Sequence, residues 1–224
     1  MKNFENIVVI YPKDKTTDFL NPIFEFLVSL LPNCSAYRPD YNSTFHTYVT
    51  ENTQLIIFIG HGTSSGLFGG TNEFGEKNQI CNVEWGANFF NECSVVLFSC
   101  NSADYLKNIK KYPISLNNYI VFGDMPTDKE HVEHNQNQHR GYWKTCKEET
   151  LLFYMNSLVD AISIGFYKSI QSNSFIGFYK GVCRSINKQI NVVIDSSTWT
   201  KEIKLDLIER LVKVKLEIEY FEMN

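Results

Sequence analysis

A histidine and a cysteine each stand directly after an apolar run that is typical of a buried strand. His61 follows the run at 54–60 (QLIIFIG), and Cys100 follows the run at 94–99 (SVVLFS). The ends of buried strands are where α/β proteins place their reactive side chains. A thiolate is a nucleophile, and a histidine can donate a proton to a departing amine. The pair therefore suits acyl transfer at a peptide bond.

The stretch between the two residues is long enough for a crossover from one strand to the next. Consecutive parallel strands are commonly neighbours, so His61 and Cys100 are predicted to open onto one crevice. Gly62 has no Cβ, and its backbone N–H is expected to approach a substrate carbonyl and stabilise the oxyanion. The Asn-Ser pair at 101–102 is expected to cap a helix that starts near Ala103, whose first amides favour the thiolate.

Alternating strands and helices must position this pair. Nearly continuous apolar runs predict strands covered on both faces, at 7–11, 54–60, 94–99 and 119–123, with a weaker fifth at 34–37. Helical spacing predicts helices at 17–31, 84–92, 103–111, 148–170, 175–190 and 203–211. The alternation predicts a single α/β domain over residues 1–224, built on a doubly wound sheet.

Four local details complete the predicted architecture. The helix at 17–31 has Thr16, Thr17 or Asp18 as its cap, and Pro22 marks where it begins or kinks. The glycine-rich stretch at 66–79 predicts a surface hairpin. The tail at 212–220 alternates strictly between apolar and charged residues, which predicts a final antiparallel strand at a sheet edge.

Composition restricts the classes of function. The chain has 224 residues, 43% of them hydrophobic and 21% charged, as in ordinary soluble globular domains. A net charge of −4 with no basic stripe argues against nucleic-acid binding. The apolar runs fall short of the roughly 20 residues of a membrane span, and no signal-peptide pattern is present. The six cysteines lack CxxC spacing, which indicates free thiols in a reducing, cytoplasmic setting.

The two strand-tip motifs, IIFIGHG and VVLFSC, resemble the caspase-like cysteine peptidases, the group that contains caspases, metacaspases, separases and bacterial CHAT domains. The aromatic pair Phe166-Tyr167 and the loop GDMPTD are similar to the CHAT type. The likeness extends over about residues 7–190. It implies a three-layer sandwich with a six-stranded, mostly parallel sheet between helices, and no metal or cofactor. It also implies His61 as general acid/base, Cys100 as nucleophile, and an oxyanion hole formed by the amides of Gly62 and Cys100.

The sequence departs from that family at two positions. Many relatives carry a glycine two or three residues after the cysteine, where this chain reads Cys-Asn-Ser-Ala. Members that cleave after basic residues have an Asp two residues before the nucleophile, where this chain has Phe98. We therefore expect a non-basic P1 residue, unless Asp124 or Asp128 enters the substrate-binding pocket. Both follow the strand at 119–123 and are expected to face the crevice, although a role as turn residues fits them equally.

The segment at 124–146 is the longest stretch without apolar periodicity, and it has few apolar residues to fix it. We expect it to be either disordered or folded over Cys100 until a partner protein orders it. It also contains His131, His134 and His139, with Cys146 at its end. A zinc site is not expected there, because no second cysteine stands at ligand spacing.

The sequence therefore predicts a cytoplasmic cysteine endopeptidase that acts on a protein substrate and is latent until a regulatory protein activates it. The resemblance alone implies a role in bacterial anti-phage defence or programmed cell death. A catalytically inactive caspase-like module that binds a protein partner is the first alternative. A flavodoxin-like protein that binds a nucleotide is the second, although neither GxGxxG nor GxxxxGK[ST] occurs.

Overall fold

A central sheet of six strands organises the molecule, which a computed structural model describes for all residues except 2, 128–131, 134–142, 144–145 and 224. The strand order is β2-β1-β3-β7-β8-β9. All neighbouring pairs are parallel except β8 with β9, which is antiparallel. The prediction of an α/β protein with a mostly parallel sheet is confirmed. The strands are β1 (Ile7–Ile10), β2 (Cys34–Tyr37), β3 (Leu55–Ile59), β7 (Ser94–Phe98), β8 (Asn118–Val121) and β9 (Glu219–Glu222).

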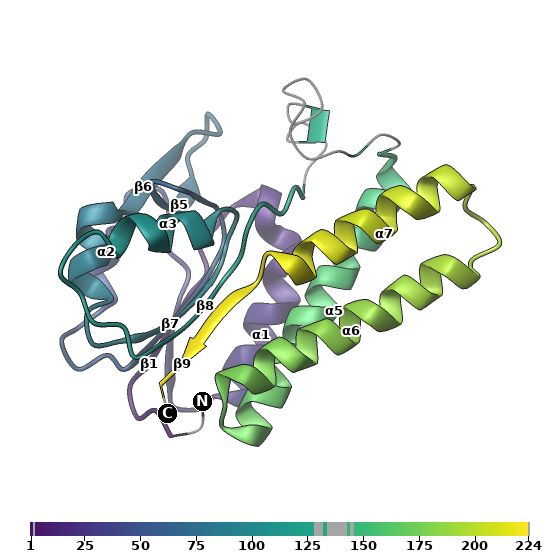
Figure 1. The fold of residues 1–224 in the computed structure, drawn as a ribbon. Helices are drawn as coiled ribbons and strands as arrows, with labels where there is room; N and C mark the ends of the chain where they lie inside the picture. Colours follow the sequence, from purple (N-terminus) through teal and green to yellow (C-terminus); the bar gives the residue numbers. More distant parts are fainter. Residues whose placement is uncertain (2, 128–131, 134–142, 144–145, 224) are drawn as a thin grey trace.

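Helices cover both faces of this sheet (Figure 1). One face carries α1 (Asn21–Leu30), α5 (Glu148–Ser172), α6 (Phe175–Asp195) and α7 (Lys201–Leu216). The other face carries α2 (Val83–Phe89) and α3 (Ser102–Ile109). Two short 3-10 helices, η1 (Lys15–Leu20) and η2 (Phe45–Thr47), lie in the connections between strands.

The apolar strands are continuous because both of their faces are buried. In β3, Ile57 and Ile59 belong to the core under α1 and α5, whereas Ile56 and Phe58 belong to the core under α2 and α3. All four are 0% exposed. Every position of the strand therefore requires an apolar side chain, and no polar alternation can appear in the sequence.

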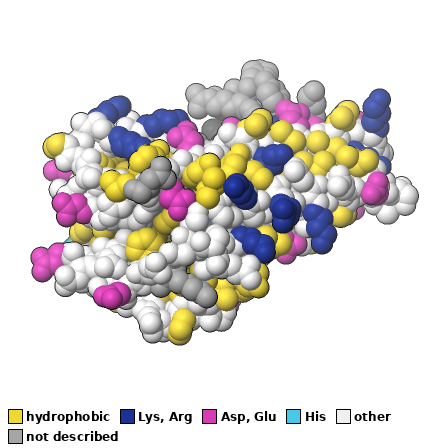
Figure 2. Space-filling model, turned by 60° about the horizontal axis from the view of Figure 1, so that its bottom comes forward, with side chains coloured by type: hydrophobic (Ala, Val, Ile, Leu, Met, Phe, Trp, Pro, Cys, Tyr) yellow, Lys and Arg dark blue, Asp and Glu magenta, His cyan; other side chains and the backbone are white. Residues whose placement is uncertain are grey.

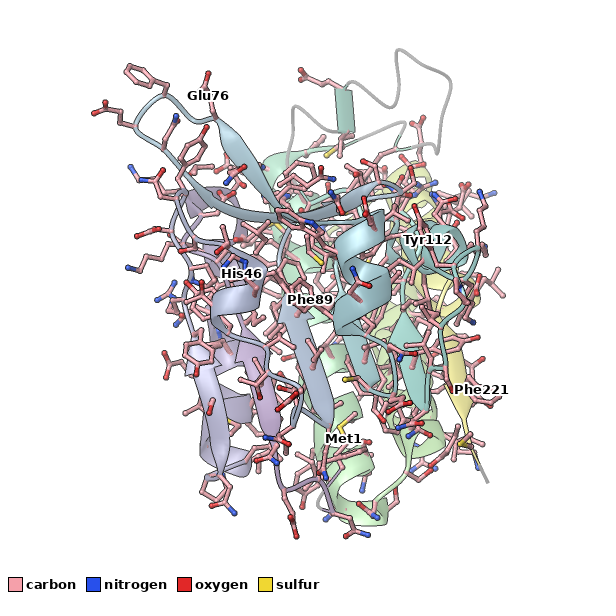
Figure 3. All side chains as sticks on the ribbon, turned by 90° about the vertical axis from the view of Figure 1, so that its left-hand side faces the viewer. Met1, His46, Glu76, Phe89, Tyr112 and Phe221 are labelled. Atoms are coloured by element: carbon pink, nitrogen blue, oxygen red, sulfur yellow. The ribbon has the colours of Figure 1, made fainter. Side chains whose placement is uncertain are left out.

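A small antiparallel sheet stands above the carboxyl edge of the main one. It consists of β4 (Gly62–Thr63), β5 (Gly66–Thr71) and β6 (Lys77–Asn82), and its tip projects outward near Glu76 (Figure 3). The predicted hairpin at 66–79 is thus confirmed. Its glycines serve close packing, since a Cβ on Gly66 would lie 2.5 Å from the Cys81 oxygen and one on Gly70 2.6 Å from the Lys13 oxygen.

The predicted strand at 212–220 is wrong except at its last two residues. Helix α7 continues to Leu216, and only Glu219–Glu222 forms a strand, although that strand is antiparallel and at the edge as expected. The buried apolar residues of α7 recur at helical spacing, namely Ile203, Leu207, Leu211 and Val214. Burial of this stripe against the core outweighs the local alternation of charges.

By length and composition alone, α5 qualifies as a helix that could cross a membrane, which the short apolar runs of the sequence did not suggest. Half of its apolar stretch is buried inside the fold, where it packs against α1 and α6. A core helix of a globular protein meets the same criterion.

Candidate functional site

His61 and Cys100 lie side by side at the carboxyl edge of the sheet. Strands β3 and β7 are parallel neighbours whose last residues, Ile59 and Phe98, are paired. The residues that follow them are in close contact, because a Cβ on Gly62 would lie 2.6 Å from the Ser99 Oγ and 3.0 Å from the Cys100 oxygen. His61 and Cys100 line the same cavity, as the strand-tip motifs predicted.

This shared cavity is very small. It holds about 20 Å³, enough for roughly one water molecule. Thr17 and Leu20 wall it from the β1 side, and Met125 and Thr127 from the segment after β8. The Cys100 thiol donates a hydrogen bond to the Met125 oxygen at 3.1 Å. The described start of the 124–146 segment therefore contacts the sulfur and leaves Cys100 partly exposed.

The histidine is held by two residues whose role the sequence did not suggest. His61 Nε2 lies 2.6 Å from Thr16 Oγ1 and 3.3 Å from Asp14 Oδ2. Thr16 Oγ1 donates its single proton to Asp14 Oδ1 at 2.8 Å, so it accepts from His61 Nε2–H. This assignment leaves Nδ1 of His61 as the unprotonated nitrogen, the one able to take a proton.

Asp14 is a buried carboxylate, with a side chain only 1% exposed. Its Oδ1 also accepts the Thr16 backbone N–H at 2.8 Å, which caps η1. Its Oδ2 lies near His61 Nε2 and 3.6 Å from Lys77 Nζ, but no aligned hydrogen bond reaches it within the described residues. Burial opposes ionisation, yet nearby His61 and the hydrogen bonds from Thr16 outweigh it and hold the pKa of Asp14 well below its usual range.

Asp14 and Thr16, the two partners of His61, also line a large open groove of about 790 Å³. The groove lies between the segment after β1 and the β5–β6 hairpin, and Lys77 and Arg38 are among its lining residues. The Arg38 guanidinium is 4.8 Å from the centre of the Tyr11 ring, which fixes its position by a cation–π contact. The two residues that hold His61 thus form part of the wall of a preformed polar groove.

The turn after Cys100 differs from the expected cap. Asn101 adopts the left-handed conformation with φ 56°, and its side chain forms no capping hydrogen bond. Ser102 Oγ instead donates to the Leu97 oxygen at 2.7 Å. The Asn101 and Ala103 amides donate to carbonyl oxygens of the segment after β8, at 2.8 and 2.9 Å. These two amides are therefore occupied, and the prediction that the first amides of the helix favour the thiolate does not hold for them.

The expected substrate-binding residues are placed differently from one another. Phe98 is 3% exposed and forms an apolar wall of the dyad cavity. Asp124 does not line that cavity. It faces α7 instead, where Lys213 Nζ lies 3.4 Å from its Oδ2 and its backbone N–H donates to Glu217 Oε2 at 3.0 Å. Asp128 lies outside the described residues.

The described residues of the 124–146 segment include more buried apolar side chains than its sequence suggested. Three of its apolar side chains, Met125, Val132 and Trp143, are at most 4% exposed and belong to the core. Trp143 packs edge-to-face on Tyr154, with ring centres 5.2 Å apart.

The remaining candidates of the sequence have structural or undescribed positions. Phe166 is fully buried against Phe178, whereas the Tyr167 hydroxyl accepts a hydrogen bond from Gln171. The three loop histidines at 131, 134 and 139 lie outside the described residues. In the described part of the chain, no three His, Cys, Asp or Glu side chains are grouped to hold a metal.

No family model matches this chain, and no curated protein does. The proposed chemistry therefore has to rest on the geometry of these residues and on the resemblance of the two motifs.

Proposed function

We propose that the protein is a caspase-like cysteine endopeptidase in which Cys100 and His61 form the catalytic dyad. The observation that carries the proposal is their position in one cavity at the ends of adjacent parallel strands, with Asp14 and Thr16 behind the histidine. A nucleophile, a base and a group that orients the base are the parts that covalent acyl transfer needs.

In the proposed mechanism, His61 Nδ1 takes the thiol proton and the Cys100 thiolate attacks the substrate carbonyl carbon. The resulting imidazolium is stabilised by the buried Asp14 carboxylate, as in other nucleophile–base–acid arrangements. His61 then donates the proton to the leaving amine as the C–N bond breaks. A water molecule, deprotonated by His61, hydrolyses the thioester and frees Cys100.

The backbone geometry of β4 supports Gly62 as a donor to the oxyanion. The Phe68 amide donates to the His61 oxygen at 3.1 Å, so His61 and Phe68 form a hydrogen-bonded pair of the antiparallel ladder. Gly62, opposite Leu67, is then the non-hydrogen-bonded position, whose N–H points away from β5. In our proposal this N–H and the Cys100 amide bind the substrate oxygen.

The lining of the cavity bears on the substrate class. Phe98 is an apolar wall of the small cavity and Asp124 is paired with Lys213, so the described lining of that cavity offers no acidic group for an arginine or lysine at P1. We infer a protein substrate cleaved after a non-basic residue, with the chain lying along the groove beside His61. A peptide library with a strong arginine or lysine preference would overturn this specificity.

The small volume of the cavity is compatible with two hypotheses about this site, a latent enzyme and an inactive module. We propose latency: a regulatory protein moves the segment at 124–127 off the sulfur, and the cytoplasmic enzyme is only weakly active until then. The same small volume is the observation that favours the second candidate, an inactive caspase-like module that binds a protein partner. The role in anti-phage defence or programmed death rests on the family resemblance alone.

Labelling with two electrophiles distinguishes these states. Iodoacetamide is small, whereas a peptidyl chloromethyl ketone must occupy the substrate site. We expect both to modify Cys100, the ketone more slowly, and both rates to fall in the His61→Ala variant. Equal rates with and without His61 would favour the inactive module, and modification of Cys34 or Cys146 in place of Cys100 would contradict the dyad.

A further inference from the structure

A second concave surface lies between α5 and α6, away from the dyad. It is a groove of about 230 Å³ near the turn that joins the two helices. That turn is held at the amino edge of the sheet, where the Met1 amino group donates to Asn173 Oδ1 at 2.7 Å (Figure 3). The groove thus faces away from the carboxyl edge that carries His61 and Cys100.

A row of cations borders this groove. Lys180 and Arg184 line it from α6 and Lys168 lines it from α5. Lys188, four residues after Arg184, continues the exposed row along α6 beyond the groove. No carboxylate of the described chain lies within ion-pair distance of these four residues. Like charges four residues apart destabilise a helix, so the row lowers the stability of α6 with no described internal compensation. Figure 2 shows Lys and Arg side chains gathered over the helical part of this face.

The floor of the groove is apolar and recessed. Gly181 has no side chain there because a Cβ would lie 3.1 Å from the Gly165 Cα and 3.1 Å from the Ile164 oxygen. Gly177 also lines the groove, next to Ser172. The Ile164 side chain, 40% exposed, supplies an apolar wall. The recess can therefore accept one apolar side chain between flanking positive charges.

We propose that this groove docks an acidic amphipathic helix of a partner protein. An apolar side chain of that helix would enter the recess beside Ile164. Carboxylates at every fourth position would pair with Lys180, Arg184 and Lys188, since both helices rise about 6 Å over four residues. The surface is a concave recess with a single row of cations, which matches the ridge of a helix better than the flat surface of a bilayer.

The test is binding of a fluorescent helical peptide with leucines on one face and glutamates at every fourth position beside them. Fluorescence anisotropy at physiological salt should show saturable binding. The triple variant Lys180→Glu, Arg184→Glu, Lys188→Glu should weaken binding about tenfold or more, as expected for loss of several ion pairs and like-charge repulsion. A matched triple variant of scattered exposed lysines, Lys15→Glu, Lys111→Glu and Lys201→Glu, changes the net charge equally and should weaken binding less than about threefold.

Two further measurements separate docking from general attraction. Ile164→Ala leaves the charge unchanged and should weaken binding severalfold, whereas a scrambled peptide of the same composition should not bind. Equal effects of the two triple variants, or equal binding of the scrambled peptide, would overturn the proposal. So would binding of phosphatidylserine vesicles without binding of the peptide. None of these readouts depends on peptidase activity, so the proposal stands or falls separately from the catalytic dyad.

Discussion

The two strand ends that meet at the site differ in how their polar side chains are held. At the end of β3, His61 is held by Thr16 and Asp14 and adjoins an open groove of about 790 Å³. At the end of β7, Cys100 donates its hydrogen bond to the Met125 oxygen in a cavity of about 20 Å³. The histidine is held by two partners, while the cysteine thiol is bonded to the connection after β8.

This difference suggests where control is exerted in a peptidase of the proposed kind. Orienting the histidine requires a buried carboxylate, which is costly to assemble and is already present. Uncovering the thiol requires that Met125 and Thr127, which come from the connection after β8, move away, and the Met125 side chain must then leave the core. Access to the sulfur, and not the chemistry of the dyad, is then the step that a partner would regulate.

The largest effect is expected from removal of either dyad residue. Cys100→Ala and His61→Ala should each lower turnover of denatured protein by at least about 10³-fold, and the double variant should be no worse than the weaker single one. Thermal denaturation should show that each single variant loses no more than about 1 kcal/mol. Cys183→Ala, which removes a half-buried thiol on α6, is the control and should keep full activity. An aggregating Cys100→Ala protein would indicate a structural role.

Asp14→Asn should have the second-largest effect. It tests whether the carboxylate beside His61 contributes to the reactivity of Cys100. The amide cannot stabilise an imidazolium, so the rate of Cys100 labelling by iodoacetamide should fall about ten- to a hundredfold. Asp18→Asn, at an exposed carboxylate of the same segment, is the matched control. An unchanged rate in Asp14→Asn would mean that Asp14 only caps η1.

The pH dependence of stability gives Asp14→Asn a second readout. Because the folded pKa of Asp14 is lowered, its ionisation stabilises the fold above the unfolded value of about 3.9 and this stabilisation is lost as the pH falls below it. Urea denaturation should therefore show the variant about 1–3 kcal/mol less stable than the native protein at pH 7. The gap should narrow only below about pH 4.

The sequence was sufficient to predict the sheet and the position of the dyad because both depend on strong local signals. The apolar runs at 54–60 and 94–99 fix two buried strands, and a parallel pairing forces their following residues together. It was also sufficient for α5 and α6, whose buried residues recur at helical spacing over many turns.

Asp14 could not be predicted in the same way. The helix after β1 was expected to start at 17, with Thr16, Thr17 or Asp18 as its cap, whereas a 3-10 turn starts at Lys15 and Asp14 caps it. The contact of Asp14 with His61 joins two loops far apart in the sequence, and no local periodicity encodes it. The available signal was an acidic residue just beyond the strand that neighbours β3. The same lack of local information explains Asp124, whose partner Lys213 is on the last helix.

Gly62→Ala should have an intermediate effect, because it changes the spacing of the two strand ends. The new Cβ would lie 2.6 Å from the Ser99 Oγ and 2.9 Å from the Ser99 Cβ, so His61 and Cys100 must separate slightly. We expect a loss of about 1–3 kcal/mol in stability by denaturant titration, with slower labelling of Cys100. Adding Ser99→Ala removes the nearer of these two atoms and should restore part of both. If neither stability nor labelling rate recovers in the double variant, Gly62 is required for its backbone conformation and not for its contact with Ser99.

The smallest effect is expected at Lys77. Its substitution tests how a positive charge on the large groove affects the pairing of Asp14 with His61. Lys77 Nζ lies 3.6 Å from Asp14 Oδ2, so its charge competes with a protonated His61 for the same carboxylate. Lys77→Met should therefore favour the imidazolium–thiolate pair and speed iodoacetamide labelling of Cys100 about two- to fivefold at low salt, the size expected for one partly exposed ion pair. The gain should shrink at about 0.5 M salt, where charges on the open groove are screened.

Lys13→Met is the matched control, at another lysine of the same groove that forms no ion pair with a described carboxylate. It should leave the labelling rate unchanged within about twofold. Slower labelling in Lys77→Met would show the reverse arrangement, in which Lys77 holds Asp14 in place for the histidine.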